Sequence, residues 1–164
     1  MDSGEKVKKI SRAMRNRIDS CKIQVVKDEK FCVLATVSDR RPYCSLMAYI
    51  SEEDCRKIYM ATLRNTVKYR NLIENPVVSL LIDSRTKAFD THVNEIKALT
   101  IIGQFAEVRN GSRRMEVRDM LLQRHPYLDI FLDHLESCLF SVEVHSFLLL
   151  NGFTDSYYEI VSSS

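Results

Sequence analysis

Glycine, proline and tryptophan are scarce in this chain, which has 4 glycines, 3 prolines and no tryptophan among its 164 residues. The phosphate loops of many nucleotide-binding proteins need several closely spaced glycines, because only glycine allows the tight turn and the close approach of the backbone to a phosphate. Neither a G-x-G-x-x-G nor a Walker pattern occurs in the sequence. Phosphate recognition through a glycine-rich loop is therefore excluded.

No sign of charge dominates, and no long apolar run occurs. The 24 basic and 22 acidic residues give a formal net charge of +2, whereas a protein that binds nucleic acid in bulk carries a strongly basic surface. No stretch reaches the roughly 18 apolar residues of a membrane-spanning helix, and residues 1–12 (MDSGEKVKKISR) lack the apolar segment of a secretion signal. We therefore expect a cytoplasmic protein whose partners include neither nucleic acid nor a membrane.

The five cysteines are scattered, odd in number and never arranged as C-x-x-C. They are Cys21, Cys32, Cys44, Cys55 and Cys138. A zinc site needs clustered thiolates, and a secreted disulfide scaffold needs an even set. We interpret them as reduced thiols that pack mostly in the core, because a free cysteine behaves as a small apolar residue. We expect no metal site and no cysteine nucleophile.

The chain has no repeat, low-complexity block or flexible linker, so we expect a single domain over residues 1–164. Residues 1–20 predict an N-terminal helix, because apolar side chains recur there at helical spacing. These side chains are Val7, Ile10, Met14 and Ile18. At the other end, we expect residues 159–164 to form a polar tail.

Short apolar or alternating runs, separated by turn residues, predict six strands. They are 31–37, 43–50, 57–62, 77–83, 98–108 and 139–150. Helices are predicted over 66–74, from Ser112 and from Pro126, and a polar loop over 84–97. Many antiparallel-capable strands with few helices indicate a mainly β protein. The expected architecture is a six-stranded antiparallel barrel with its helices packed outside.

The segment 61–69 (ATLRNTVKY) is the most informative part of the chain. It predicts the end of a strand, a hydroxyl-rich turn and the start of a helix, whose free N–H groups attract phosphate. Arg64 can form a forked contact with phosphate oxygens, Lys68 adds a point charge and the Thr66 hydroxyl can donate. Taken alone, such a basic helix start is more often a solvated surface turn, so both interpretations stay open.

The order of several segments along the chain favours the phosphate site over a solvated surface turn. Residues 34–37 (LATV), 41–45 (RPYCS), 58–62 (IYMAT), 64–83 and 98–104 resemble, in sequence and spacing, the FMN-binding split β-barrel proteins of the pyridoxamine 5'-phosphate oxidase-like family. The resemblance covers roughly residues 25–155, which is nearly the whole chain. Its most specific part is the central block that begins at Arg64.

The resemblance implies a homodimer that holds FMN at the subunit interface, outside a barrel too small to enclose it. It assigns the FMN phosphate to Arg64, Thr66 and Lys68. It places the flavin beside the strand residues Ala61 and Thr62 and beside Tyr43, Cys44 and Ser45. It also suggests a contact from Gln104 of the partner subunit. Arg85 is a further candidate for contact with cofactor or substrate, although an ordinary surface arginine is the simpler interpretation.

The corresponding function is an FMN-dependent oxidoreductase acting on an unidentified small molecule, with NAD(P)H as a candidate reductant. The flavin carries such chemistry, and the sequence nominates no catalytic side chain. Vitamin B6 oxidation is not expected, because the chain lacks the C-terminal segment with tryptophan and arginine. Two alternatives remain, a non-catalytic flavin-binding module and a haem-binding protein on the same barrel. The latter needs a suitably placed histidine, whereas His92, His125, His134 and His145 are each expected at the surface.

Overall fold

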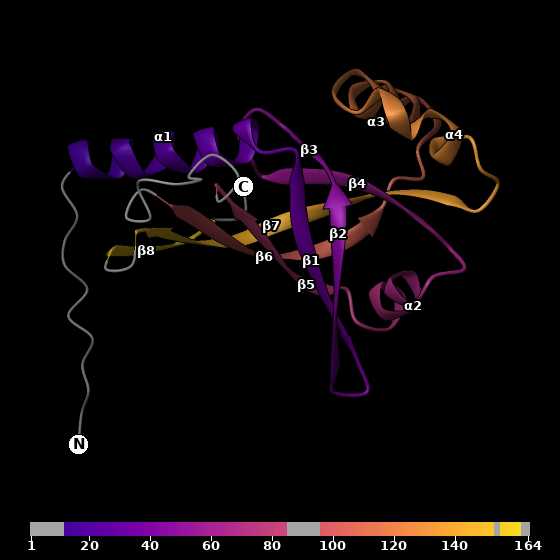
Figure 1. Cartoon of the computed structure of the whole chain (residues 1–164), viewed down its shortest axis with the longest axis horizontal. Coiled ribbons are helices and arrows are strands. Elements are labelled where there is room, and N and C mark those ends of the chain that lie inside the picture. The colour runs from indigo at the N-terminus through magenta and orange to yellow at the C-terminus, as the bar shows by residue number, and fades with distance from the viewer. Residues whose placement is uncertain (1–11, 85–95, 153–154, 162–164) are drawn as a thin grey trace.

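A curled antiparallel sheet with helices on its outside forms the core of the structure (Figure 1). The computed structural model describes residues 12–84, 96–152 and 155–161. The elements are α1 (Arg12–Asp28), β1 (Phe31–Ser38), β2 (Arg41–Ala48), β3 (Ile50–Ser51), β4 (Lys57–Leu63), α2 (Val67–Glu74), β5 (Val77–Asp83), β6 (Lys97–Glu107), α3 (Gly111–Arg124), the 3₁₀ turn η3 (Pro126–Leu128), α4 (Asp129–Leu132), β7 (Ser137–Asn151) and β8 (Asp155–Ile160).

The strand order makes the sheet curl back on itself. Its path runs β2-β1-β5-β6-β7-β4-β3, and β8 pairs with β7. Only Tyr49 separates β2 from β3, so both ends of the path lie in one short stretch of chain. Counting β2 and β3 as one interrupted strand gives six barrel strands, which confirms the predicted split β-barrel. The predicted strand 43–50 corresponds to this interrupted pair.

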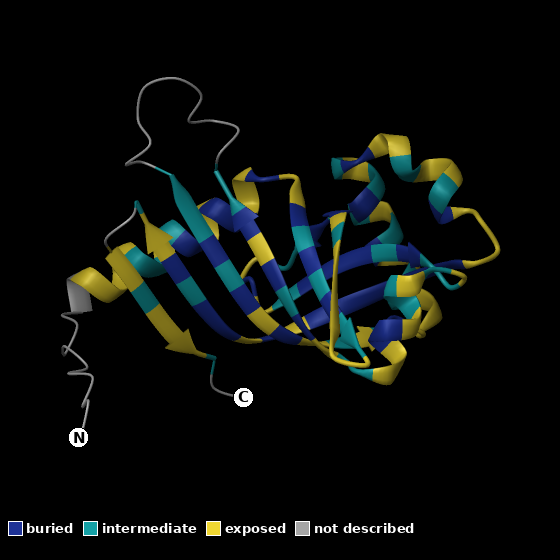
Figure 2. Cartoon of the chain, turned by 60° about the horizontal axis from the view of Figure 1, so that its bottom comes forward, coloured by how far each residue is buried: buried dark blue, intermediate teal, exposed yellow. Residues whose placement is uncertain are grey.

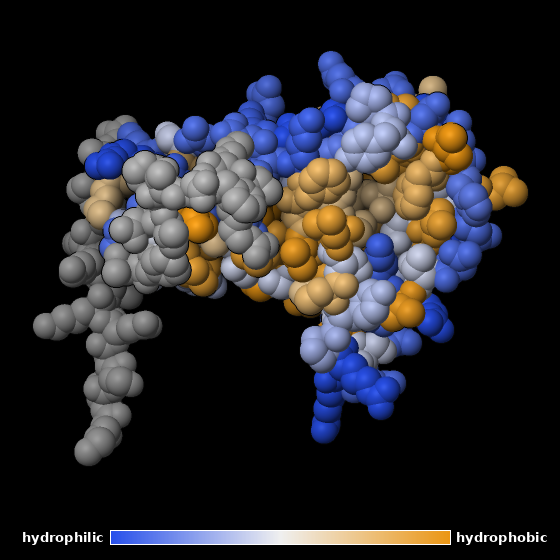
Figure 3. Space-filling view, viewed as in Figure 1, coloured by the Kyte–Doolittle hydropathy of each residue, from blue (hydrophilic) through white to orange (hydrophobic). Residues whose placement is uncertain are grey.

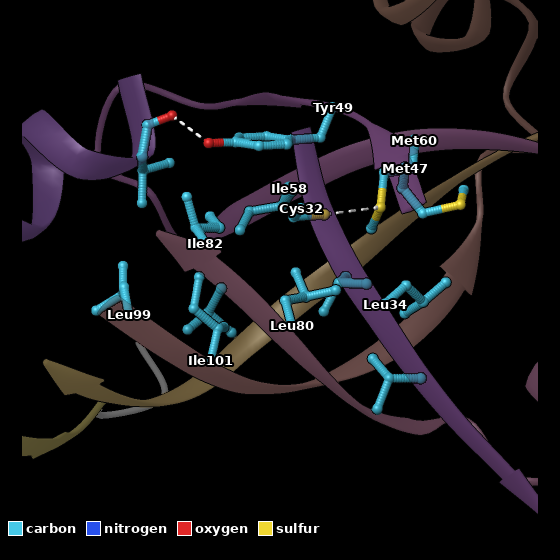
Figure 4. Close-up of a cluster of buried hydrophobic side chains, with 14 of the residues drawn as sticks. Cys32, Leu34, Met47, Tyr49, Ile58, Met60, Leu80, Ile82, Leu99 and Ile101 are labelled. Carbon is cyan, nitrogen blue, oxygen red and sulfur yellow. Dashed lines mark hydrogen bonds between the residues drawn. The ribbon is translucent and has the colours of Figure 1, made fainter. Parts of the chain in front are cut away.

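Side chains fill the barrel interior. The largest cluster of buried side chains takes alternate residues from the barrel strands, and Figure 4 shows them pointing toward one another. Leu34, Ile58, Leu80 and Ile101 are each fully buried there. A barrel of this size, packed in this way, leaves no internal space for a flavin-sized ligand. Any such ligand must bind outside the barrel.

A second apolar cluster attaches the helices α3 and α4 to the outer face of the sheet. Tyr59 and Leu139, whose neighbours along the strands face the barrel interior, pack there against Val117 and Leu121 of α3. Figure 2 shows buried and less buried residues alternating along strands such as β5, whereas the first half of β7 is buried almost throughout. Strands β4 and β7 are therefore buried on both faces in this region, which fixes the position of the β4–α2 connection that follows.

Two expectations about the ends of elements need correction. The helix α1 continues to Asp28, beyond the predicted end at residue 20. Residues 159–164 are not simply a tail, because Glu159 and Ile160 belong to β8. This strand was missed because its sequence, DSYYEI, is polar and mostly exposed, as suits an edge strand that pairs only with β7. Arg85 and His92 lie outside the described residues.

The cysteines behave as expected for reduced thiols. All five are free; Cys32, Cys55 and Cys138 are buried, whereas Cys44 is exposed. Burial raises the pKa of Cys32 to about 12, so this thiol stays protonated and unreactive at neutral pH. These three buried thiols serve as core residues.

Candidate functional site

Thr66 caps the helix that follows β4. Its backbone is extended, with φ −104° and ψ 156°, and its hydroxyl oxygen accepts a hydrogen bond from the Tyr69 amide at 3.3 Å. The same hydroxyl donates to the Leu63 carbonyl at 2.7 Å. Its proton is thus committed to the turn, as is typical of an N-cap threonine. Thr66 shapes the start of α2 but has no free proton to donate to a phosphate in this conformation.

The first two amides of α2 remain available. In an α-helix the first N–H groups have no partner within the helix. Thr66 satisfies the amide of Tyr69, and the amide of Arg70 donates to the Thr66 carbonyl at 3.3 Å. Within the described part of the chain, the amides of Val67 and Lys68 make no hydrogen bond. Two donors without a partner among the described residues therefore lie at the positive end of a helix dipole.

Lys68 is a half-buried ammonium without a counter-charge. Its Nζ lies 3.5 Å from the Sδ of Met47 on β2, and among the described residues no carboxylate pairs with it. Partial burial lowers the pKa of Lys68, because desolvation disfavours the charged form. An anion at this position would restore the lost solvation.

Arg64 is engaged elsewhere. One guanidinium nitrogen pairs with Glu107, the last residue of β6, and another donates to the Tyr69 hydroxyl at 2.6 Å. The guanidinium also stacks over the Tyr69 ring at 5.4 Å. The Glu107 hydrogen bond raises the pKa of Arg64, and the same contact lowers the pKa of Glu107. Both groups therefore stay charged at neutral pH.

Hydrogen bonds tie α2 to the β1–β2 hairpin. The side chain of Asn71, which is buried, donates to the Thr36 hydroxyl at 3.1 Å, and that hydroxyl donates to the Tyr43 carbonyl at 3.3 Å. The Lys68–Met47 contact reaches the same hairpin. The structure thus brings the turn at Thr66 close to the strand that carries Tyr43, although the two segments lie far apart in the sequence.

The other residues of the predicted flavin site differ in burial and lie on three different strands. Thr62 is buried and lies across from Cys138, with its hydroxyl 3.2 Å from that of Thr66. Ala61 packs on the second cluster, beneath α3. Tyr43 and Cys44 are exposed and Ser45 is half-buried, all on β2, which pairs along its length only with β1. Gln104 is exposed on β6, between Val77 and Glu143 of the flanking strands.

A model of the pyridoxamine 5'-phosphate oxidase family matches residues 23–128, a segment that includes the barrel strands β1 to β6 and the whole β4–α2 turn. This segment is more than half of the chain. The protein belongs to the pyridoxamine 5'-phosphate oxidase family. No curated protein matches the sequence.

Solved structures share the fold of this pyridoxamine 5'-phosphate oxidase family member. A putative pyridoxamine 5'-phosphate oxidase from Listeria innocua aligns with a TM-score of 0.65 at 15% identity, over 82% of this chain and 99% of that one. A FAD-binding protein from Mesorhizobium loti aligns with a TM-score of 0.63 at 16% identity, over 79% and 91%. A heme-binding protein from Mycobacterium smegmatis aligns with a TM-score of 0.73 at 13% identity, over 85% of this chain and 56% of that one. The chain thus spans about half the length of the mycobacterial protein. At such identities the likeness shows the fold alone.

Two of the hollows on the described part of this family member do not include Lys68. One, of about 580 Å³, lies between α1 and strands β6 to β8, with Arg17, Lys97 and Tyr157 in its wall. The other, of about 340 Å³, includes Lys27 and Arg124. Neither contains a residue of the predicted flavin site. The predicted flavin site therefore coincides with neither hollow.

Large apolar side chains are exposed on the helix that carries Lys68, on the strand that contacts Lys68 and on the strand that follows the helix. On β2, α2 and β5, Leu46, Ile73 and Val77 are 73%, 55% and 51% exposed. Figure 3 shows hydrophobic side chains gathered over the middle of the molecule, where β1 and β2 lie in Figure 1. Contiguous apolar surface of this kind marks interaction sites.

The histidines differ from the expectation at one position. His125 is fully buried, with Nε2 2.9 Å from the Tyr49 carbonyl and Nδ1 2.9 Å from the Tyr127 hydroxyl, so its predicted surface location is wrong. His134 and His145 are exposed, as expected. No group of three or more metal-ligating side chains occurs among the described residues. Within those same residues, no helix is long and apolar enough to cross a membrane.

Proposed function

We propose that this protein binds FMN with the phosphate at the start of α2 and acts as a flavin-dependent oxidoreductase on a small molecule in the cytoplasm. The observation that carries the proposal is the half-buried, unpaired ammonium of Lys68 beside two unpaired amides at a helix N-terminus. A phosphate would accept hydrogen bonds from both amides and supply the missing counter-charge. The family supports a flavin rather than another phosphate ligand.

A homodimer is part of this proposal. The barrel interior is filled, so a flavin must bind on the outside of the barrel. The exposed apolar side chains on β2, α2 and β5 offer a surface for a second copy. A stable interface buries about 1,000 Å² or more. We infer that the second copy covers this surface and forms the other wall of the flavin site, with Gln104 as a candidate contact from the partner.

The residues of this chain would hold and orient the cofactor. Lys68 and the α2 amides would bind the phosphate, and Tyr43, Cys44 and Ser45 on β2 would lie along the ring system. Thr62 and Ala61 would support the turn from behind. FMN, when bound, supplies hydride-transfer chemistry, for which NAD(P)H is a candidate donor. None of these side chains is assigned to proton transfer.

Haem binding, the alternative function, has weaker support from the side chains. His125, which lies in the helix pair after β6, is buried and occupied at both ring nitrogens. The exposed His134 accepts a hydrogen bond from the Glu136 amide at 3.1 Å. The fold is shared with a heme-binding protein, but that likeness does not extend to a ligand.

An absorption spectrum of the purified protein, taken after FMN is added and the excess removed by gel filtration, tests the proposal. We expect about one FMN per subunit and, for Lys68→Gln, an FMN affinity lowered about ten-fold or more, since a hydrogen bond to a charged group contributes roughly 1.5–3 kcal/mol. Arg70→Gln is the matched control, because it removes an exposed charge from the same helix. A protein that refuses FMN, or equal losses in both variants, would refute the proposed site.

Turnover separates the enzyme from a non-catalytic flavin-binding module. Flavin-loaded protein is mixed with NADH or NADPH under anaerobic conditions, and bleaching of the flavin absorbance is followed. Reduction at a rate well above that of free FMN supports the oxidoreductase. Bound flavin that neither pyridine nucleotide reduces any faster than it reduces free FMN favours the module.

A further inference from the structure

We propose that Arg64 does not bind the phosphate but positions the phosphate-binding turn, and that Glu107 is the residue that holds Arg64 in this role. Among the described residues of this chain, Lys68 then supplies the only side-chain charge at the phosphate. This inference rests on the proposed function, because it concerns how the same site is built. It departs from the sequence-based prediction, in which Arg64 contacts the phosphate directly.

The Arg64 guanidinium is held by two partners, although its side chain remains 37% exposed. One terminal nitrogen donates to Glu107 and the other to the Tyr69 hydroxyl, and the guanidinium carbon lies 5.4 Å from the centre of the Tyr69 ring. The Arg64 amide also donates to the Glu136 carbonyl at 2.9 Å. Both the backbone and the side chain of Arg64 are thus fixed to the end of the barrel.

Moving Arg64 to a phosphate would leave Glu107 poorly paired. The Glu107 side chain is only 10% exposed, and its other oxygen accepts a hydrogen bond from Arg109 at 3.3 Å. Arg109 is 81% exposed, so solvent screens that contact. A nearly buried carboxylate that loses its main partner is strongly disfavoured. Glu107 therefore keeps Arg64 where it is.

Tyr69 transmits this arrangement to α2. It lies in the first turn of the helix, directly after Lys68, and its amide donates to the Thr66 cap. Arg64 therefore connects the end of β6 to the turn that presents Lys68 and the free amides. A site oriented before its ligand arrives loses less conformational entropy on binding. The expected contribution of Glu107 and Arg64 is such preorganisation.

The direction in which Glu107→Gln changes FMN affinity tests this inference. FMN affinity is measured by flavin fluorescence, and unfolding by thermal melts. If Glu107 positions Arg64, the variant should bind FMN about ten-fold more weakly, which is what losing a residue that orients a ligand typically costs at metal sites. Tighter binding would mean that Glu107 competes with phosphate for Arg64. A lower melting temperature with unchanged affinity would mean a structural role only. Either of these last two results would overturn the inference.

Arg109→Gln is the matched control, because Arg109 contacts the same carboxylate from solvent, and we expect it to leave affinity unchanged. A double-mutant cycle supplies the second test. Positioning through the Lys68 turn predicts that Arg64→Gln costs less affinity in the Lys68→Gln background than in the wild type, because only the amides are then left to be positioned, whereas two independent phosphate ligands would give additive losses. If Arg64→Gln does not fold, Arg64→Lys replaces it in the cycle. Wild-type protein that binds no FMN would refute the proposed function and this inference with it.

Discussion

The Nε2 atom of His125 lies 2.9 Å from the carbonyl oxygen of Tyr49, the single residue between β2 and β3. Since a carbonyl can only accept, Nε2 carries the proton, and Nδ1 accepts from the Tyr127 hydroxyl. The end of α3 is thereby joined to the interruption in the barrel. Because the imidazole is fully buried and neutral, its protonation state bears on stability.

Stability should fall in acid because of His125. Burial lowers its pKa below the ordinary 6.5, so the unfolded chain binds a proton more readily than the folded one. The contribution of neutral His125 is complete above pH 6.5 and is lost as the pH falls toward the lowered folded-state value. Urea unfolding at pH 7.5 and pH 5.5 should show a smaller pH dependence for His125→Gln than for wild type. An equal dependence in both proteins would assign the acid sensitivity to other groups.

As the pH rises, FMN affinity should begin to fall at a lower pH than it would if Lys68 had the pKa of an exposed lysine. The pKa of Lys68 is lowered by burial, so the ammonium loses its proton at a lower pH than an exposed lysine does. Because the neutral amine offers no charge to a phosphate, wild-type affinity should decline as the pH rises from 7 to 10. Lys68→Arg, which stays charged throughout, should show a flatter profile. Parallel profiles would argue against Lys68 as the phosphate ligand.

Gly103 should not tolerate a side chain. A Cβ there would lie 2.5 Å from the Glu143 carbonyl oxygen and 2.6 Å from a Val142 methyl group, at the register shift between β6 and β7. Gly103→Ala should destabilise the protein by about 1–3 kcal/mol, as overpacking does. Gly111→Ala is the control, because nothing lies within 4 Å of its added carbon. Denaturant unfolding of both variants measures the contrast.

Leu46→Glu should weaken the proposed homodimer. Leu46 is 73% exposed on β2, next in sequence to Met47, which contacts Lys68, and a charge within an apolar interface costs association energy without disturbing the monomer core. Sedimentation should show a larger monomer fraction and FMN binding should fall, with little change in circular dichroism. Leu135→Glu, at a residue 98% exposed beyond α4, should leave the dimer intact. A monomeric wild-type protein that binds FMN would contradict the dimer model.

Periodicity sufficed for the strands that face the core. The alternation of Phe140, Val142 and Val144 predicted a strand over 139–150, and β7 spans Ser137–Asn151. By contrast, β8 carries no such pattern, because it pairs with only one strand and both its faces are largely exposed. The hydrophobic signal reports burial, and a strand that buries little gives little signal.

The sequence predicted the local segment of the candidate site but not the long-range contacts that hold it. The local segment that contains Arg64, Thr66 and Lys68 can be predicted from the sequence, because a turn and a helix start depend on neighbouring residues. The partner of Arg64 cannot be predicted in this way, because Glu107 lies 43 residues away in the sequence. The two residues meet only because β6 pairs with β7 and β7 pairs with β4. The same holds for His125, which reaches Tyr49 across 76 residues. Local patterns carry no information about such register-dependent contacts.

The interruption at Tyr49 gives the barrel a seam. On one side of it, β3 offers only two residues to β4, so the hydrogen-bond ladder there is short. The Tyr49 ring closes the seam instead, with its hydroxyl bonded at 2.7 Å to the Val26 carbonyl of α1, while His125 holds its carbonyl from the side of α3. The two flanking helices therefore hold the barrel closed at Tyr49. Removing either helix should let the strands separate first at this position.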